Sequence, residues 1–297
     1  TWTLIANHFD PTLIKNYLAY SVCNEFASQP YTTSLEFVDL YLNNEYQGVY
    51  AVCEQIEAHK NRVNIKTSWG EPQDMNYLIE LDNRLRLEHE TGLNIFSSES
   101  NYYKIHYPDV EDTEYTQDFT DYVKNYFQDC YTAVNGKDWA TISNLVDIES
   151  CAETYIMHEF FKNSDAGFSS FYMYIHHVSG EPKLTFGPLW DFDLTADFNN
   201  RSYEQITVAG RNIWFKKMFE FHEFKQVVKE ELAKYKSTII STINEKVSKI
   251  LAIPSCFEQN FKKWEKVIKY TDWKDKVKNT KQWLLSSLDY VYNFYNE

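Results

Sequence analysis

The spacing of hydrophobic residues changes along the chain, and this change constrains the fold more than any other sequence feature. A helix is expected over residues 10–26, because Asp10 suits an N-cap, Pro11 suits the first turn, and apolar residues follow at helical spacing. The pattern then alternates with period two, which predicts a hairpin. Its strands are residues 34–42 and 48–54, and further strand candidates are residues 77–81 and 102–107. The first third of the chain is therefore expected to be rich in antiparallel strands.

Helical spacing returns after Pro108. Helices are expected over residues 115–134 and from an N-cap at Asp147 to about Lys162, and everything beyond Asn212 reads as helical, with a firm break at Pro254. A short hairpin, residues 170–176 and 183–186, interrupts this part as a small two-strand insert. The order predicts an α+β fold in which a strand-rich part, residues 1–110, packs on a mostly helical part, residues 111–297, within a single domain.

Charge limits the partners. The 297 residues carry a formal net charge of −14, and residues 1–210 hold 12 basic against 32 acidic side chains. Nonspecific nucleic-acid binding draws its free energy from phosphate neutralisation, so we expect no nucleic-acid partner. No apolar stretch approaches the length of a membrane span. Aromatic residues make up 17% of the chain. They fit a ring-filled core or a stacking surface for sugars or bases.

Three carboxylates stand at turns around the short hairpin. Asp165 follows a helix end and precedes a strand, and Asp191 and Asp193 follow the second strand and Gly187-Pro188. Pairing of the two strands would bring their outer ends together, and with them the three acids. Three converging carboxylates need a cation, or at least one must stay protonated. Mg²⁺ bound to one or two carboxylates and to phosphate oxygens would meet that need in phosphoryl transfer. The alternative is a turn residue at Asp165 and a surface acidic pair at 191 and 193, because D-x-D is short and recurs by chance.

Several ordered blocks resemble one family. The run TWTLIANHFDPTLIKNYLAYSV (residues 1–22) is similar to the W-x-L-x-A-N strand and D-P-(S/T)-L helix of the CotH family, atypical protein kinases of bacterial spore coats and secreted proteins. EFVDLYLNNEYQGVYAVCEQIEAHKNRVNI (residues 36–65) is similar to the family's hairpin with its K-N-R-V-N-I tail. YYKIHYPD, KNSDAGFSSFYMY, KLTFGPLWDFDL and WFKKMFE follow in the family's order. The resemblance covers nearly the whole chain.

The resemblance implies a divergent protein-kinase-like fold that transfers phosphate from ATP, with Mg²⁺, to Ser or Thr of another protein. Carried over by position, Asp165 resembles the catalytic aspartate, Asp191 a magnesium ligand and Asp193 a second one. Protein kinases place a metal-binding Asn five residues after the catalytic Asp, where this chain has Ser170. Asn163 is a candidate to replace that ligand from the other side.

A second departure concerns the phosphate-binding cation. Family members carry a basic K-S-(Y/F)-x-x-K strand before the block that begins here, and we expect this chain to lack it. The chain starts at Thr1 without Met, so it is expected to be a domain cut from a longer protein. The remaining candidates for phosphate contact are Lys15, Arg62 and Lys104, with Glu54 as an ion-pair partner for one of them. Each could also be an ordinary surface or packing charge.

Other interpretations stay open. A metal-dependent phosphodiesterase or nucleotidyltransferase could use the same acids, and a degenerate CotH-like domain could be a binding module of a secreted or cell-surface protein. His176-His177 is a weak metal signal, because adjacent strand residues point to opposite faces. Glu80 and Asp82 share a strand face, as a glycosidase pair would, but a solvated strand end fits them better. The resemblance favours a place outside the cell or on its surface, with the spore coat as the alternative.

Overall fold

The computed structural model describes residues 1–29, 31–265 and 270–297. A three-stranded antiparallel sheet near the N-terminus has the order β1-β3-β2, with β1 at Trp2–Ile5, β2 at Leu35–Leu42 and β3 at Glu45–Glu54. The β2–β3 pair is the predicted hairpin. Asn43 and Asn44 both have left-handed backbones at its turn, with φ of 51° and 65°, as a tight hairpin turn needs.

Helix α1 spans Lys15–Cys23, so the helix predicted from residue 10 begins later than expected. Leu13 has a left-handed φ of 65°, which a helix cannot continue through. The Asp10 carboxylate instead organises the preceding loop, because it accepts the backbone N–H groups of Thr12 and Lys15 at 2.9 and 2.8 Å. Asp10 therefore satisfies a donor at the helix start from outside the N-cap position.

The second sheet has five antiparallel strands in the order β5-β6-β4-β7-β8. Its strands are β4 at Tyr77–Leu81, β5 at Ile95–Ser98, β6 at Asn101–Tyr107, β7 at Phe171–Val178 and β8 at Glu181–Phe186. The hairpin that the sequence marked as a separate two-strand insert is β7–β8, and it pairs with β4 through Leu81 opposite Phe171. The separate-insert prediction is wrong, because this long-range pairing leaves no local signal. As a result, the residues that follow β4 lie beside those that precede β7.

Helices cover this sheet and fill the rest of the molecule. Asp147 caps α5 as predicted, because its side chain accepts the N–H of Ser150. The larger helices outside α1 are α3 at Gln117–Asn135, α4 at Trp139–Leu145, α5 at Ile148–Phe160, α7 at Ile213–Met218, α8 at His222–Ala252, α9 at Pro254–Lys263 and α10 at Tyr270–Asn296. Shorter turns of helix are η1 at Pro72–Asp74, α2 at Arg84–Leu87, η2 at Asp165–Gly167, η3 at Phe198–Asn200 and α6 at Val208–Arg211. The helical prediction beyond Asn212 is confirmed in outline, although its residues 266–269 lie outside the described part of the chain.

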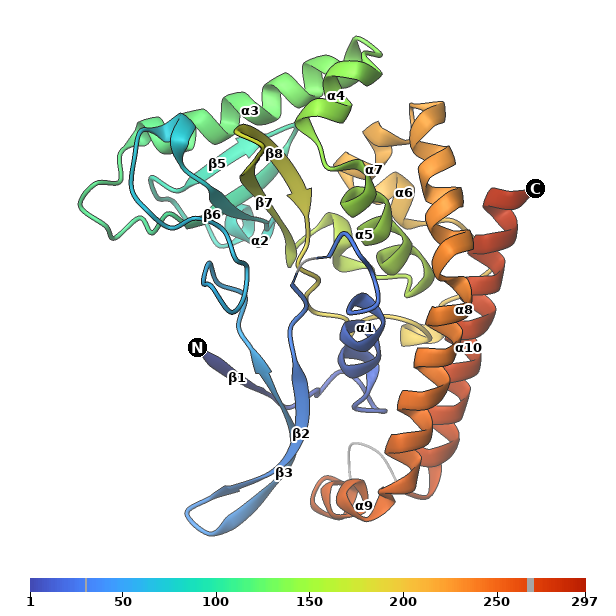
Figure 1. Cartoon of the computed structure of the whole chain (residues 1–297). Helices are drawn as coiled ribbons and strands as arrows, with labels where there is room; N and C mark the ends of the chain where they lie inside the picture. The colour runs from blue at the N-terminus through green and yellow to red at the C-terminus, as the bar shows by residue number, and fades with distance from the viewer. Residues whose placement is uncertain (30, 266–269) are drawn as a thin grey trace.

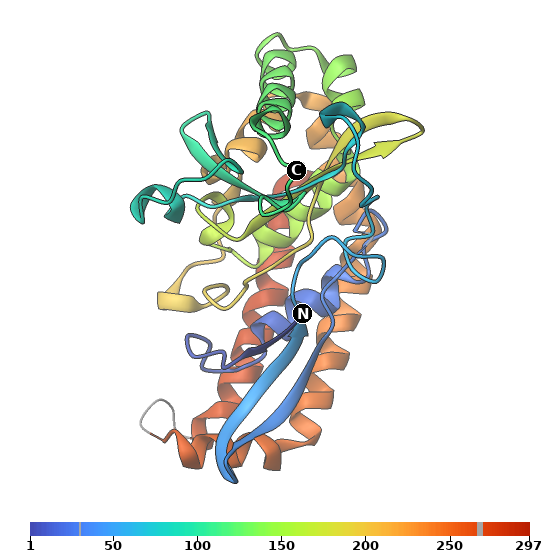
Figure 2. The ribbon, with the colours of Figure 1, turned by 90° about the vertical axis from the view of Figure 1, so that its left-hand side faces the viewer.

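The elements form an α+β body, as predicted. The long helices α8 and α10 run side by side along one flank of both sheets (Figures 1 and 2). Helix α3 covers one face of the five-stranded sheet, where Phe127 packs against Phe96 and Tyr103. On the other face, Val63 from the loop after β3 packs with Leu78 of β4. Many aromatic side chains are fully buried, which supports the ring-filled core. No helix of the described chain is long and apolar enough to cross a membrane.

Candidate functional site

Asp165 lies in a tight loop between α5 and β7. The Asn163 side chain accepts the N–H of Asp165 at 2.9 Å, which fixes the backbone that carries the carboxylate. Lys162 and Ser170 stand on either side of this loop with left-handed φ values of 51° and 56°. Such backbone conformations are uncommon outside glycine and cluster where the surrounding structure imposes them, often at functional sites.

Asp191 and Asp193 lie in the loop after β8. Asp191 has a left-handed φ of 61°. Helix α1 holds this loop, because the Tyr20 hydroxyl accepts the N–H of Asp191 at 3.3 Å and the Asn16 side chain accepts the N–H of Phe192 at 2.6 Å. The Tyr20 ring stacks on Trp190, with ring centroids 6.0 Å apart. The N-terminal helix therefore positions an acidic loop that lies far from it in the sequence.

The two loops meet through the flanking polar residues. Asn163 Nδ2 donates to the carbonyl oxygen of Asp191 at 3.2 Å, and the Ser170 hydroxyl donates to Asp191 Oδ2 at 3.4 Å. The structure thus brings Asn163, Ser170, Asp165 and Asp191 together, and Asp193 lies within hydrogen-bonding reach of Asp191. We call Asp165, Asp191 and Asp193 the acid centre.

The Asp191 carboxylate affects the pKa of the other two acids. Burial, and next the Asp191 carboxylate, raises the pKa of Asp193 to about 7. Burial and Asp191 also raise the pKa of Asp165 above its usual range, against the lowering influence of Arg201 and Arg84. Crowded, half-buried carboxylates of this kind hold a proton more tightly unless a cation compensates their charge.

Buried polar groups hold the Asp165 loop in place. Asn212 donates from Nδ2 to the Ala166 carbonyl, and its Oδ1 caps α7 by accepting the N–H groups of Trp214 and Phe215. The fully buried Glu159 of α5 pairs with Lys162 at 2.7 Å and accepts the N–H of Val208 at 2.7 Å, which ties α5 to the start of α6. These roles leave no local sequence signal, because Asn212 and Glu159 act on residues that are distant in sequence.

The predicted phosphate-binding cations are bound by other groups of the protein. Lys15 is buried, and its ammonium donates to the Thr195 carbonyl at 2.8 Å and lies 3.4 Å from Asp197, so it holds the loop that follows the acid centre. Lys104 lies 3.3 Å from Glu90. The expected pairing of Glu54 with a cation is present, because Arg62 lies 3.8 Å from it.

Arg62 is also held by other partners, since it bonds Glu57 and the Thr1 carbonyl. The phosphate roles of Lys15, Arg62 and Lys104 remain predictions. Two cations that the sequence analysis did not name, Arg84 and Arg201, act on Asp165 instead. The Arg201 guanidinium is engaged by the Lys162 and Leu194 carbonyls.

The acid centre offers only oxygen ligands, which suit a hard cation. Among the described residues, no three His, Cys, Asp or Glu side chains form a ready-made metal cage. Mg²⁺ is typically held by one or two carboxylates together with phosphate and water oxygens. Asp191 and Asp193 would supply two such carboxylates, and Ser170, whose hydroxyl bonds Asp191, would supply a neutral oxygen.

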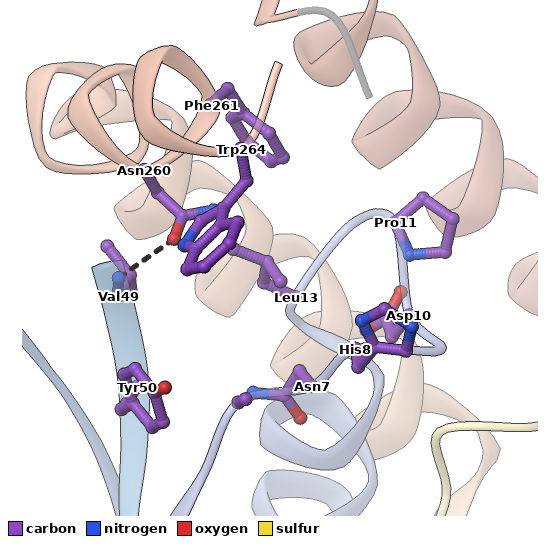
Figure 3. A pocket seen from close by; sticks show the side chains of 11 residues that line it. Asn7, His8, Asp10, Pro11, Leu13, Val49, Tyr50, Asn260, Phe261 and Trp264 are labelled. Atoms are coloured by element: carbon purple, nitrogen blue, oxygen red, sulfur yellow. Dashed lines mark hydrogen bonds between the residues drawn. The ribbon is translucent and has the colours of Figure 1, made fainter. Parts of the chain in front are cut away.

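A cavity of about 320 Å³ lies between the residues 6–13 loop, β3 and α9. Figure 3 shows Trp264 and Asn260 on one side of it and His8 and Asp10 on the other. None of the three acids lines this cavity. His176 and His177, the weak metal candidates, contact different residues. His176 bonds Thr185 at 3.0 Å, and His177 bonds the side chain of Asn76, just before β4.

Comparison with known families supplies the identity. The profile of the family described as CotH kinase protein matches residues 1–291 of the chain. No curated protein matches the sequence. The match spans both sheets, the acid centre and most of the helical flank. The chain therefore belongs to the CotH kinase protein family.

Proposed function

We propose that this chain is a magnesium- and ATP-dependent protein kinase that phosphorylates Ser or Thr of another protein. The observation that carries the proposal is the linkage of the two acidic loops. Asn163 and Ser170 connect the Asp165 loop to Asp191, and Asp191 shares its surroundings with Asp193. A carboxylate beside a metal-binding pair is the set of groups that phosphoryl transfer requires.

Each residue has a separate task in this proposal. Asp191 and Asp193 hold Mg²⁺, which neutralises charge on the phosphate oxygens when it is bound. Asp165 accepts the proton of the acceptor hydroxyl. The hydroxyl oxygen forms a bond to the γ-phosphorus while the bond from that phosphorus to the bridging oxygen breaks, and ADP leaves. Asn163 and Ser170 keep the two loops in register through their hydrogen bonds to Asp191. The raised pKa of Asp165 suits a proton acceptor.

The partners and location follow from the family and stay part of the proposal. The acceptor is a Ser or Thr of a protein, and the acidic body of residues 1–210 favours a basic segment around it. We place the protein outside the cell or on its surface, with the spore coat as the alternative that the family offers. We propose that the nucleotide binds between the strand-rich and the helical parts.

The thermal midpoint tests the nucleotide site. Wild type is compared with Asp191→Ala and, as a matched control, with Asp129→Ala, an exposed acid on α3. Each is measured with ATP and Mg²⁺, with ATP and EDTA, and with neither. A ligand at a hundred times its Kd stabilises by about 2.7 kcal/mol, which moves the midpoint by a few degrees. We expect a magnesium-dependent shift in wild type and Asp129→Ala and none in Asp191→Ala.

The product separates the rival functions. Mass spectrometry of a basic test protein such as histone or myelin basic protein, incubated with the chain and ATP, should show added phosphate. An added nucleoside monophosphate would establish a nucleotidyltransferase instead. If wild type shows no shift at saturating ATP, the kinase proposal fails and a binding module becomes the better interpretation.

A further inference from the structure

Arg84 is a half-exposed cation that is fixed in place beside the acid centre. It is the first residue of α2, which follows β4. Its guanidinium forms a bidentate ion pair with Asp82, in which Nε lies 2.9 Å from Oδ1 and Nη2 lies 2.9 Å from Oδ2. Glu80 lies 3.8 Å from Nη2. The side chain is nevertheless 46% exposed. Asp82 engages Nε and Nη2, and within the described part of the chain no hydrogen bond occupies Nη1, so Nη1 can contact a further anion.

The backbone next to Arg84 is joined to the Asp165 loop. Asn83 donates its N–H to the Phe168 carbonyl at 2.7 Å, and its side chain reaches the Gly167 carbonyl at 3.5 Å. The pairing of Leu81 with Phe171 holds the same two segments together within the sheet. The charge of Arg84 accordingly acts on both Asp165 and Asp191.

Other cations that the sequence or the structure places in this part of the molecule are engaged elsewhere. Lys15 is buried against Thr195 and Asp197, and the Arg201 guanidinium is used by two carbonyls. Lys104 is paired with Glu90. Of these cations, only Arg84 and Arg201 are found to act on Asp165, and of the two only Arg84 is oriented by a carboxylate.

We propose that Arg84 donates to the γ-phosphate of the bound nucleotide, on the side of the acid centre that faces β4 and α2. This inference rests on the proposed function. A guanidinium held by a carboxylate is preorganised, so it contacts a phosphate with little loss of side-chain entropy. In the transfer step Arg84 then balances the charge of the phosphoryl oxygens while Asp165 takes the hydroxyl proton.

Calorimetric titration of ATP and of ADP, each with Mg²⁺, tests the contact without an activity assay. Wild type is compared with Arg84→Ala, Arg84→Lys and Arg86→Ala, an exposed arginine of the same helix. Only ATP carries the γ-phosphate. We expect Arg84→Ala to weaken ATP binding about tenfold or more and ADP binding less than twofold, the loss of a charge-assisted hydrogen bond. Arg84→Lys should lie between, and Arg86→Ala should match wild type.

The outcomes separate this inference from the proposed function. Equal losses for ATP and ADP, no loss for either, or a change in the KM of the acceptor protein alone would overturn the γ-phosphate contact. If wild type binds ATP and Asp191→Ala does not, while Arg84→Ala keeps the wild-type ratio of affinities, only the Arg84 contact fails. Absence of ATP binding by wild type overturns both. Should Arg84→Ala not fold, as judged by circular dichroism, Arg84→Lys decides through the same ratio.

Discussion

Asp165 should affect the chemical step without affecting nucleotide binding. Its carboxylate stands beside the proposed metal ligands Asp191 and Asp193, and Asn163 accepts only the backbone N–H of Asp165. Asp165→Asn keeps the shape but removes the proton acceptor, so we expect phosphate transfer to fall by about 10²- to 10⁴-fold. The Kd for ATP with Mg²⁺ should stay within about threefold, in contrast to Asp191→Ala. Rapid-quench transfer and calorimetry measure the two, with the exposed Asp118→Asn as control. A transfer rate above about a tenth of wild type would remove Asp165 from the base role.

Glu153 should make stability depend on pH in the direction opposite to an ordinary carboxylate. It is buried in α5 and accepts the N–H of Ser28 at 3.0 Å. Burial, with Glu231 adding to it, raises the pKa of Glu153 from 4.5 to about 7. The folded protein therefore binds this proton more tightly than the unfolded chain does. The stability that the group contributes is complete below about pH 4.5 and is lost as the pH rises to about 7.

Glu153→Gln removes this dependence, because a glutamine oxygen still accepts the Ser28 N–H and carries no charge. At pH 8 we expect the variant to be more stable than wild type by about 1–2 kcal/mol, and at pH 4.5 to differ little. Urea unfolding at a series of pH values measures the difference, and Glu149→Gln, exposed on the same helix, is the control. Asp193, whose pKa is raised to about 7, titrates in the same pH range, but it does so in all three proteins, so its effect on the stability difference cancels. A variant that loses stability at pH 8 would contradict the assignment.

At the level of single residues, part of the candidate site could be predicted from the sequence. Asp165, Asp191 and Asp193 were visible because they stand at the ends of a recognisable hairpin, and strand pairing alone brings such ends together. Arg84 was not visible. Its place beside Asp165 depends on the contact of Asn83 with Phe168, between segments that are far apart in the sequence. Lys15 was predicted as a phosphate contact, and the sequence could not show that its ammonium is buried against Thr195.

At the scale of elements, Asn212 should connect the helical part to the chemistry. It caps α7 and also donates to the Ala166 carbonyl in the Asp165 loop. Asp138 caps α4 in a comparable way but is exposed. Replacing either by Ala should cost about 0.5–2 kcal/mol of stability, the usual value of an N-cap. We expect only Asn212→Ala to lower the rate of transfer as well, because it also releases the loop that carries Asp165. Equal rates in the two variants would show that the Ala166 contact has no part in catalysis.

Predictions of elements succeeded where one segment contains the whole signal. The β2–β3 hairpin, α5 with its Asp147 cap and the β7–β8 hairpin follow from local spacing and turn residues. The start of α1 did not, because apolar spacing runs on through Leu13 while its left-handed backbone breaks the helix. The pairing of β7 with β4 could not be predicted either, since register between distant strands is set by the shared core and not by either strand.

For the molecule as a whole, the helical flank connects parts that would otherwise be separate. Helix α8 packs against α1, α5 and α10, and α9 packs against β3 of the three-stranded sheet. Helix α10 is tied at several points along its length. Trp273 donates to the Thr12 carbonyl at 2.9 Å, and Trp283 donates to the Arg201 carbonyl at 3.1 Å. The loop before α1 and the loop after the acid centre are thus both anchored to α10.

This arrangement predicts one cooperative unfolding transition for residues 1–297, although two lobes of this total size often unfold separately. Unfolding of either sheet would expose the apolar faces of helices that the other sheet also needs, so partial unfolding is unfavourable. Far-ultraviolet circular dichroism reports the helices, and tryptophan fluorescence reports the eight tryptophans of the chain, among them Trp190 beside the acid centre. Both probes should give the same midpoint, and ATP with Mg²⁺ should move both equally in wild type and neither in Asp191→Ala. Separate midpoints, with only the fluorescence transition responding to the nucleotide, would show instead that the acid centre belongs to a lobe that unfolds on its own.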